Sequence, residues 1–292
     1  MKVRVSPCLP REIGVVGLGL MGASLARAVK AADAGVRVVA VEAREEVRAR
    51  ALAEGVADVA ASAPGPELAG CEIAVLCTPI AAIEELLGPV SRLLPDGAVL
   101  TDVGGAKERL SARAAEAVRP GVAFVGAHPM FGGHGGYAGA RADRWRGKVA
   151  VCTDAPSAAV ERVAALHAAL GAQVVRCRPA DHDAAVAIVS HLPYLLASAL
   201  ALATGEVGAL AVELAGPGLQ DMTRLAQFPF DIQGEVARRN VQLPVAAARL
   251  STQLSRVLGA IAASPEAARA ALEEARAARI ALFPAPPEGG AR

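Results

Sequence analysis

One histidine of this chain stands where acid–base chemistry is expected. His128 follows an apolar run at residues 123–126 and precedes a loop with four glycines within residues 132–136. A neutral imidazole there can take the proton of an alcohol while hydride leaves the same carbon, and such general-base help is typically worth about 10²–10⁴-fold in rate. The alternative is a histidine that caps or packs the loop. His128 is the candidate catalytic base.

Further polar groups gather in the last third of the chain. Asp181-His182-Asp183 opens a helical segment, where acids also suit the helix dipole. Ser190 and His191 interrupt an apolar helix, and polar groups inside such a helix need partners or a ligand. Arg224 carries a fork suited to a carboxylate, although a salt bridge to an acid such as Asp183 is the alternative.

A glycine fingerprint near the start indicates a nucleotide site. The strand-like residues 13–16 lead into Gly17-Leu18-Gly19-Leu20-Met21-Gly22, and a helical pattern follows at residues 23–32. Gly17 permits the turn, Gly19 lets a pyrophosphate approach the backbone, and Gly22 lets helix and strand pack closely. The free N–H groups of the helix N-terminus then bind phosphate.

An acidic residue supports this interpretation. A second apolar run, residues 36–41, ends at Glu42, twenty residues after Gly22, where a carboxylate accepts hydrogen bonds from the adenosine ribose. Glu42 would repel a 2′-phosphate, which favours NAD over NADP. Arg44, close behind, could instead bind that phosphate.

The expected elements bring these residues together. Apolar runs (13–16, 36–41, 73–77, 98–101, 123–126, 149–152, 173–176) alternate with helical segments (45–54, 80–94, 107–118, 158–170), which predicts a Rossmann-type α/β fold with a parallel sheet and helices on both faces. Ligands bind beyond the carboxyl ends of such strands, so Thr78-Pro79, residues 101–107 with Val103, and His128 should meet at the nicotinamide end of the cofactor.

The pattern changes after Pro179, where strand signals end and helices continue to residue 282. We therefore expect a dinucleotide-binding domain at residues 1–178, a helical domain at 179–283 and a flexible tail at 284–292. Residues 184–203 carry no formal charge, yet we expect a buried helix pair at a domain or subunit core rather than a membrane span.

Composition excludes other classes. A net charge of +1 without a basic run gives no basis for nucleic-acid binding. The five cysteines are scattered without C-x-x-C spacing, so we expect reduced thiols, no metal site and a cytoplasmic protein. The N-terminus lacks the pattern of a signal peptide.

Together, these motifs resemble the prephenate/arogenate (cyclohexadienyl) dehydrogenase family. The shared landmarks follow in the family's order over residues 12 to about 240: the glycine fingerprint, Thr101-Asp102-Val103-Gly104 with Lys107, Gly126-Ala127-His128-Pro129-Met130, His182-Asp183, Ser190-His191-Leu192-Pro193, and Asp221-Met222-Thr223-Arg224.

The resemblance implies NAD-dependent oxidative decarboxylation of a cyclohexadienol, namely prephenate, in tyrosine biosynthesis. It assigns His128 to the catalytic base and Arg224 to the substrate carboxylate, and it places Asp183, Ser190 and His191 in the substrate pocket. It implies a homodimer formed through the helical domain. Gly17, Gly19, Leu20, Met21, Gly22, Glu42, Arg44, Thr78, Pro79 and Val103 are the expected cofactor residues.

Several positions depart from the family pattern, and three of them, Gly105, Tyr194 and Gln220, belong to the expected substrate pocket. Gly105 stands where a serine is usual, Tyr194 where a second histidine is usual, and Gln220 where a basic residue is usual; Gln233 replaces an aromatic residue. Main-chain N–H groups at Gly104 and Gly105, or water, could replace the serine.

These departures leave other functions open. The alternatives are an arogenate or amino-substituted prephenate dehydrogenase and a non-catalytic NAD-binding relative. A β-hydroxyacid dehydrogenase is disfavoured because that class places a lysine in its helical domain and residues 179–292 contain none.

Overall fold

The computed structural model describes residues 3, 5–133 and 135–284. The chain divides into two compact units between Leu243 and Pro244. The first contains two sheets and a set of short helices, and the second contains a pair of long helices.

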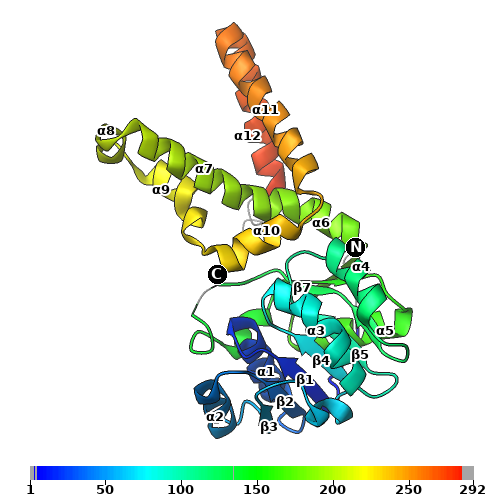
Figure 1. Cartoon of the computed structure of the whole chain (residues 1–292). Helices are drawn as coiled ribbons and strands as arrows, with labels where there is room; N and C mark the ends of the chain where they lie inside the picture. Colours follow the sequence, from blue (N-terminus) through cyan, green and yellow to red (C-terminus); the bar gives the residue numbers. More distant parts are fainter. Residues whose placement is uncertain (1–2, 4, 134, 285–292) are drawn as a thin grey trace, which may run out of the picture. The chain divides into compact units, whose positions relative to one another are not determined.

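Six parallel strands form the main sheet of the first unit (Figure 1). They are β1 (Glu12–Val16), β2 (Arg37–Val41), β3 (Val59–Ala61), β4 (Ile73–Leu76), β5 (Val99–Asp102) and β6 (Ala123–Val125), in the order β3-β2-β1-β4-β5-β6. The strand order reverses between β1 and β4, and in open α/β sheets ligands bind at such a switch point. The short edge strand β3 was not predicted from the sequence.

Amphipathic helices bury both faces of this sheet. They are α1 (Leu20–Ala32), α2 (Glu45–Ala53), α3 (Ile80–Leu93), α4 (Glu108–Ala117) and α5 (Ser157–Ala169). Leu25 of α1 and Val163 of α5 belong to one buried apolar cluster, whereas Leu87 of α3 and Leu110 of α4 belong to another. The Rossmann-type fold and the helices expected from the sequence are confirmed, with ends that shift by a few residues.

A second sheet corrects the expectation of a single parallel one. It has three strands, β7 (Ala127–Pro129), β8 (Val149–Thr153) and β9 (Gln173–Cys177), and β7 pairs with β8 in antiparallel orientation. The sequence run 123–126 therefore ends early, because Gly126 separates β6 from β7. The Gly126 carbonyl accepts the Thr153 N–H at 2.8 Å, and a Cβ at Gly126 would lie 2.8 Å from Thr153 Oγ1, so only glycine allows this approach.

After β9 the rest of the first unit is helical. It contains α6 (Pro179–Val186), the π-helical turn η3 (Ala187–His191), α7 (Leu192–Val207), α8 (Ala209–Glu213), α9 (Pro217–Thr223), the 3₁₀ turn η4 (Arg224–Gln227), a second π-helical turn η5 (Phe230–Gly234) and α10 (Glu235–Arg239). No strand follows residue 177 in the described part of the chain, as the sequence predicts.

The helices α7 to α9 expose an apolar face, formed by Leu202, Val207, Leu214 and Met222, each at least 62% exposed. The continuous stretch Pro179–Val207 is long and apolar enough to span a membrane by length and composition alone. Its first part, however, carries His182 and Asp183, which are buried against the α/β region. This anchoring holds the first part of the stretch in the folded unit, whereas most of α7 is exposed, so the buried helix pair expected from the sequence is seen only in part.

The second unit contains α11 (Leu243–Ala263) from its second residue onward and α12 (Pro265–Leu282). Ser264 caps α12, since its Oγ accepts the Ala267 N–H at 3.1 Å, and Arg256 pairs with Glu274 at 2.8 Å across the two helices. The predicted tail 284–292 lies outside the described residues except for Pro284.

Candidate active site

The glycine turn between β1 and α1 has the geometry that a pyrophosphate site requires. Gly17 adopts a positive φ of 94°, and its N–H donates to the Val41 carbonyl at 2.7 Å. A Cβ on Gly22 would lie 1.8 Å from the Gly17 carbonyl oxygen, whereas a Cβ on Gly19 would meet nothing within 4 Å. The turn is therefore closed on its inner side and open above Gly19. Gly19 is the N-cap residue of α1, and no side chain caps this helix end. This open helix N-terminus can bind phosphate.

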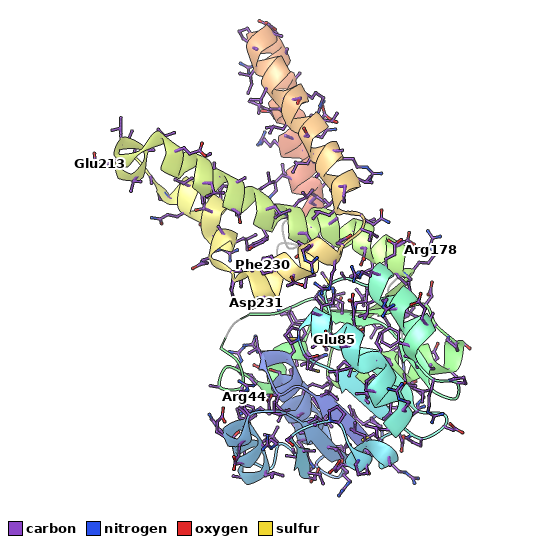
Figure 2. All side chains as sticks on the ribbon, viewed as in Figure 1. Arg44, Glu85, Arg178, Glu213, Phe230 and Asp231 are labelled. Atoms are coloured by element: carbon purple, nitrogen blue, oxygen red, sulfur yellow. The ribbon has the colours of Figure 1, made fainter. Side chains whose placement is uncertain are left out.

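Glu42 lies at the end of β2 and faces the same turn. Its carboxylate accepts the Leu18 N–H at 2.9 Å and forms a two-pronged ion pair with Arg44 through Nε at 2.8 Å and a terminal nitrogen at 3.1 Å. Burial alone would raise the pKa of Glu42, but these hydrogen bonds outweigh it and the pKa lies below its ordinary value. Glu42 is therefore ionised and suited to ribose hydroxyls, while Arg44, half exposed at the surface (Figure 2), pairs with it.

A cavity of about 630 Å³ opens beside this turn within the first unit. The nucleotide-binding region contributes to its wall through Gly19, Leu20, Met21, Thr78, Pro79, Val103, Gly105 and His128. The helical region contributes through Val189, Ser190, His191, Asp231, Ile232, Gln233 and Val236. Residues more than 100 positions apart in sequence thus meet at the sheet edge predicted to bind ligand.

His128 is connected to a buried carboxylate by a second histidine. Its Nδ1 lies 2.9 Å from His182 Nε2, and His182 Nδ1 lies 2.7 Å from Asp183 Oδ1. An ionised carboxylate only accepts, so His182 carries its proton on Nδ1 and accepts through Nε2; His128 then carries its proton on Nδ1. This assignment leaves His128 Nε2 as a free lone pair, and His128 lines the cavity.

The far end of this chain is fixed by a helix terminus. Asp183 is fully buried, and its carboxylate accepts the N–H groups of Lys107 at 2.7 Å and Glu108 at 3.0 Å, where α4 begins. The dipole of α4 stabilises the negative charge. The Arg224–Asp183 salt bridge considered from the sequence is therefore replaced by these contacts.

A second buried pair supports the same region. Lys107 Nζ binds Asp102, and Asp102 Oδ1 accepts the Ala127 N–H at 3.1 Å beside His128. Burial lowers the pKa of Lys107 although Asp102 favours its charge. The sequence suggested an anion-binding or loop-orienting role for Lys107, and the structure shows it bound to Asp102, which also contacts the start of β7.

The environment keeps His128 neutral. Burial lowers the pKa of His128 well below its ordinary value, and the neighbouring His182, Lys107 and His191 lower it further. The imidazole is thus available as a proton acceptor at neutral pH.

Both π-helical turns contribute to the cavity wall. Ser190 and His191 lie in η3, and Asp231 and Gln233 lie in η5. Single π turns occur frequently at functional sites because they redirect side chains within a helix. The sequence identified Ser190 and His191 but gave no signal for Asp231 or Ile232.

Gly105 has a specific steric neighbour. A Cβ at this position would lie 2.7 Å from Val236 Cγ1 and 3.7 Å from His128 Cε1. Val236 of α10 thus occupies the space that a serine side chain would need. The neighbouring Gly104 N–H already donates to Asp102 Oδ2 at 2.7 Å. This main-chain group is therefore not available to replace the hydroxyl of the family serine.

Three expected substrate residues lie off the cavity wall. Arg224 in η4 and Gln220 in α9 are exposed, and Tyr194 of α7 directs its hydroxyl to the Phe228 carbonyl at 3.5 Å. Arg224 forms no ion pair among the described residues. The structure therefore brings together His128, Asp183, Ser190, His191 and Gly105, but not these three.

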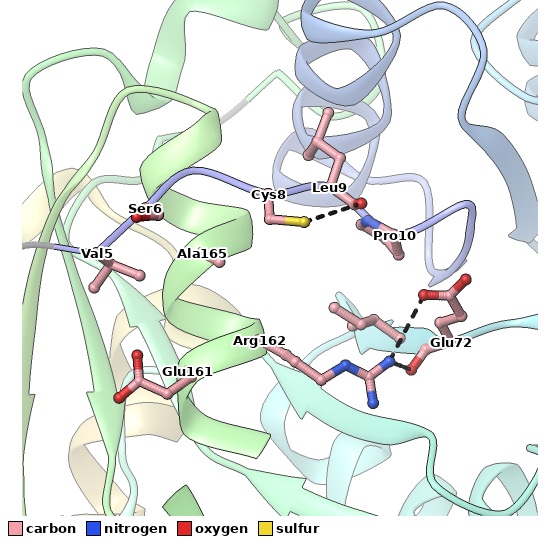
Figure 3. A pocket seen from close by; sticks show the side chains of 10 residues that line it. Val5, Ser6, Cys8, Leu9, Pro10, Glu72, Glu161, Arg162 and Ala165 are labelled. Atoms are coloured by element: carbon pink, nitrogen blue, oxygen red, sulfur yellow. Dashed lines mark hydrogen bonds and ion pairs between the residues drawn. The ribbon is translucent and has the colours of Figure 1, made fainter. Parts of the chain in front are cut away.

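A separate cavity of about 450 Å³ lies at the amino ends of β1 and β4 (Figure 3). Its wall includes Cys8, Glu72 and Arg162, and Arg162 is bound to the Glu72 carbonyl at 2.8 Å. Because parallel strands bind ligands at their carboxyl ends, this opposite edge is not the expected catalytic site.

Comparisons with known proteins agree with this geometry. Residues 25–176 match the model described as prephenate dehydrogenase, nucleotide-binding domain, and residues 178–243 match prephenate dehydrogenase, dimerization domain. The chain belongs to the prephenate dehydrogenase family. Membership accounts for a nucleotide-binding region followed by a helical region whose apolar face is exposed.

Two curated members of the family and one solved structure illustrate the dehydrogenases to which this chain is similar. Prephenate dehydrogenase of Bacillus subtilis is 29% identical over 73% of this chain and 59% of its own length. The 4-amino-4-deoxyprephenate dehydrogenase of Streptomyces pristinaespiralis is 31% identical, covering 78% of each. The crystal structure of Synechocystis arogenate dehydrogenase is 29% identical with a TM-score of 0.80, covering 93% of this chain and 99% of that one. The chain thus spans about three-fifths of the Bacillus protein.

Proposed function

We propose that this protein is an NAD-dependent dehydrogenase that oxidatively decarboxylates prephenate, or a close cyclohexadienol relative, in tyrosine biosynthesis. The observation that carries the proposal is the His128–His182–Asp183 chain, which ends at a cavity that the glycine turn also lines. Membership of the prephenate dehydrogenase family supports it.

The residues present fit a dinucleotide. The open space above Gly19 suits the pyrophosphate, and the ionised Glu42 suits the adenosine ribose. Thr78 Oγ1 is buried without a hydrogen-bond partner in the described structure, so it can bind the nicotinamide end. When bound, NAD supplies the acceptor for the hydride. The Glu42 carboxylate would repel a 2′-phosphate, and Arg44 is already paired with Glu42 rather than free to bind that phosphate, which is why we favour NAD over NADP.

His128 handles the proton of the reaction. As hydride leaves the carbinol carbon, the hydroxyl becomes strongly acidic, and His128 Nε2 takes its proton. The electron pair of the bond to the leaving carboxylate enters the ring as carbon dioxide departs. His128 then returns the proton to the phenolate oxygen of the aromatic product. Between these two proton transfers His128 is an imidazolium, and the Asp183 charge stabilises it through His182.

An amino-substituted cyclohexadienol is the second candidate. Asp231 is the charged side chain among the described residues that line the cavity, and Arg224 is not on its wall. Asp231, labelled in Figure 2, is exposed. A carboxylate at this position favours a ligand that carries an ammonium group. The relative from Streptomyces pristinaespiralis is named for such a substrate.

The test is NADH formation by the purified protein with prephenate, arogenate and 4-amino-4-deoxyprephenate in parallel, each with NAD and with NADP. We expect turnover of at least one substrate with NAD. The acid side of the kcat/KM profile should fall only below pH 6.5, because the base must be neutral and its pKa is lowered. NAD binding without turnover of any of the three substrates would favour the non-catalytic alternative.

We further propose a cytoplasmic homodimer in which the apolar face of α7–α9 is covered by a second copy. The match of residues 178–243 to a dimerization domain supports this, as does the exposure of Leu202, Val207 and Leu214. Sedimentation as a monomer at micromolar concentration would contradict it.

A further inference from the structure

Asn240 makes a set of buried contacts that determine how its amide is oriented. It is 3% exposed and follows α10. Its Nδ2 donates to the Asp183 carbonyl at 2.8 Å, and its Oδ1 accepts the Gln242 main-chain N–H at 2.9 Å. A carbonyl oxygen only accepts and an N–H only donates, so both contacts require the same orientation of the amide.

This orientation determines the protonation of His191. The same Asn240 Nδ2 lies 3.0 Å from His191 Nδ1 and has a second hydrogen for it. His191 Nδ1 must then be an unprotonated acceptor, and a neutral His191 carries its hydrogen on Nε2. His191 Nε2 has no partner in the described part of the chain, and the side chain lines the cavity.

Burial also favours the neutral ring. It outweighs the Asp183 charge, which raises the pKa of His191, and with a smaller lowering contribution from His182 the pKa lies at about 4. His128, across the same cavity, is itself neutral. A second proton on Nδ1 would also meet the Asn240 N–H head on.

We propose that Asn240 is a positioning residue that fixes His191 as a hydrogen-bond donor, through Nε2–H, to an oxygen of the ligand in the cavity. The inference rests on the proposed function for its kinetic part. The site then presents two histidines of opposite character: His128 Nε2 accepts and His191 Nε2–H donates. The recognised group is a carboxylate, carbonyl or hydroxyl oxygen, from either the substrate or the cofactor. An ammonium group is excluded at this point, since it has no lone pair to accept.

Nitrogen NMR on protein labelled with ¹⁵N-histidine tests the assignment without requiring turnover. We expect His191, identified by its loss in His191→Gln, to show a protonated Nε2 and an unprotonated Nδ1 between pH 5 and 8. In Asn240→Asp the carboxylate accepts instead, so at neutral pH the proton should move to Nδ1 and leave Nε2 unprotonated. A protonated Nδ1 in the unchanged protein would overturn the proposal, whether or not the protein is an active dehydrogenase.

Kinetics test the consequence in an active enzyme. At pH 7, Asn240→Asp should lower kcat/KM roughly 10- to 100-fold, the range for losing one hydrogen bond to a charged ligand group. The ratio of variant to unchanged enzyme should recover as the pH falls, because a doubly protonated His191 donates from Nε2 again. A purely structural role for Asn240 would give a ratio independent of pH and would overturn the proposal.

Two further comparisons complete the design. His191→Gln, whose amide can place an N–H near Nε2, should retain more activity than His191→Asn. A change confined to the KM of the substrate identifies a substrate oxygen, and a change confined to the Kd of NAD identifies a cofactor oxygen. Gln242→Ala, which removes only a side-chain bond to Glu108 at 2.7 Å, serves as the matched control and should leave the His191 signals unchanged.

Discussion

The two walls of the cavity are positioned by different means. On the nucleotide-binding wall, Gly19, Thr78 and Val103 lie on turns that directly follow β1, β4 and β5, so the main chain of the sheet places them. On the helical wall, Ser190 and Asp231 lie in π-helical turns. The helix before the first of these turns, α6, is held by the buried Asp183 carboxylate at the start of α4, and His191 of that turn is bound by Asn240.

This difference indicates which substitutions each wall tolerates. A wall built from the main chain is sensitive to added atoms where the turn is closed, because a Cβ at Gly22 would lie 1.8 Å from the Gly17 carbonyl oxygen. A wall built from side-chain hydrogen bonds is sensitive to lost or reversed donors and acceptors, because a buried group without its partner is costly. His128 belongs to both, since it lies on a strand and is oriented by His182.

Replacing His128 should have the largest effect. His128→Asn keeps a side chain that can bind His182 but removes the base, so we expect kcat to fall by about 10²–10⁴-fold or more. NAD binding should be retained, because the glycine turn is unchanged. Measurement of NADH formation together with NAD titration separates the two. Unchanged turnover would remove His128 from the mechanism.

A methyl group in the glycine turn should disrupt the nucleotide-binding wall. In Gly22→Ala the new Cβ would lie 1.8 Å from the Gly17 carbonyl oxygen, so the turn or α1 must move. We expect the Kd for NAD to rise roughly 10- to 100-fold, the cost of overpacking a rigid site. Gly259→Ala is the matched control, because a Cβ at Gly259 meets nothing within 4 Å. Equal binding by both variants would contradict the proposed contact.

The contrast between the walls also explains what could be predicted from sequence. The glycine fingerprint, Glu42 and the strand ends could be located because each is encoded within a few neighbouring residues. The second sheet could not be separated from the first, because its separation depends on the approach of Gly126 to Thr153, 27 positions away.

The long-range contacts of the helical wall could not be predicted from the sequence either. Nothing near Asn240 or Val236 in the sequence indicates that they meet His191 and Gly105, since α10 reaches these residues only through the tertiary fold. Arg224 shows the converse: its motif indicates a carboxylate site, while its side chain lies exposed in η4 and off the cavity wall.

Arg224 therefore provides a test of the helical wall. It forms no ion pair among the described residues, so its guanidinium is available to an anionic ligand. If it binds the substrate carboxylate, Arg224→Ala should raise KM roughly 10-fold with little change in kcat, as expected for losing a charge-assisted hydrogen bond. Arg249→Ala, at another exposed arginine, is the control. An unaltered KM would mean that Arg224 does not bind the substrate carboxylate.

The smallest effect is expected where the two walls touch. In Gly105→Ser the new Cβ would lie 2.7 Å from Val236 Cγ1, so a branched side chain on α10 must yield. We expect kcat/KM to fall about 5-fold, equivalent to roughly 1 kcal/mol of overpacking. The double variant Gly105→Ser/Val236→Ala should recover that loss, because the removed methyl groups vacate the space beside His128. Val236→Ala alone leaves a gap, and its kcat/KM should not exceed that of the unchanged enzyme. Full activity in Gly105→Ser alone would mean that α10 moves freely against the nucleotide-binding wall, and the rescue by the second substitution would then be absent.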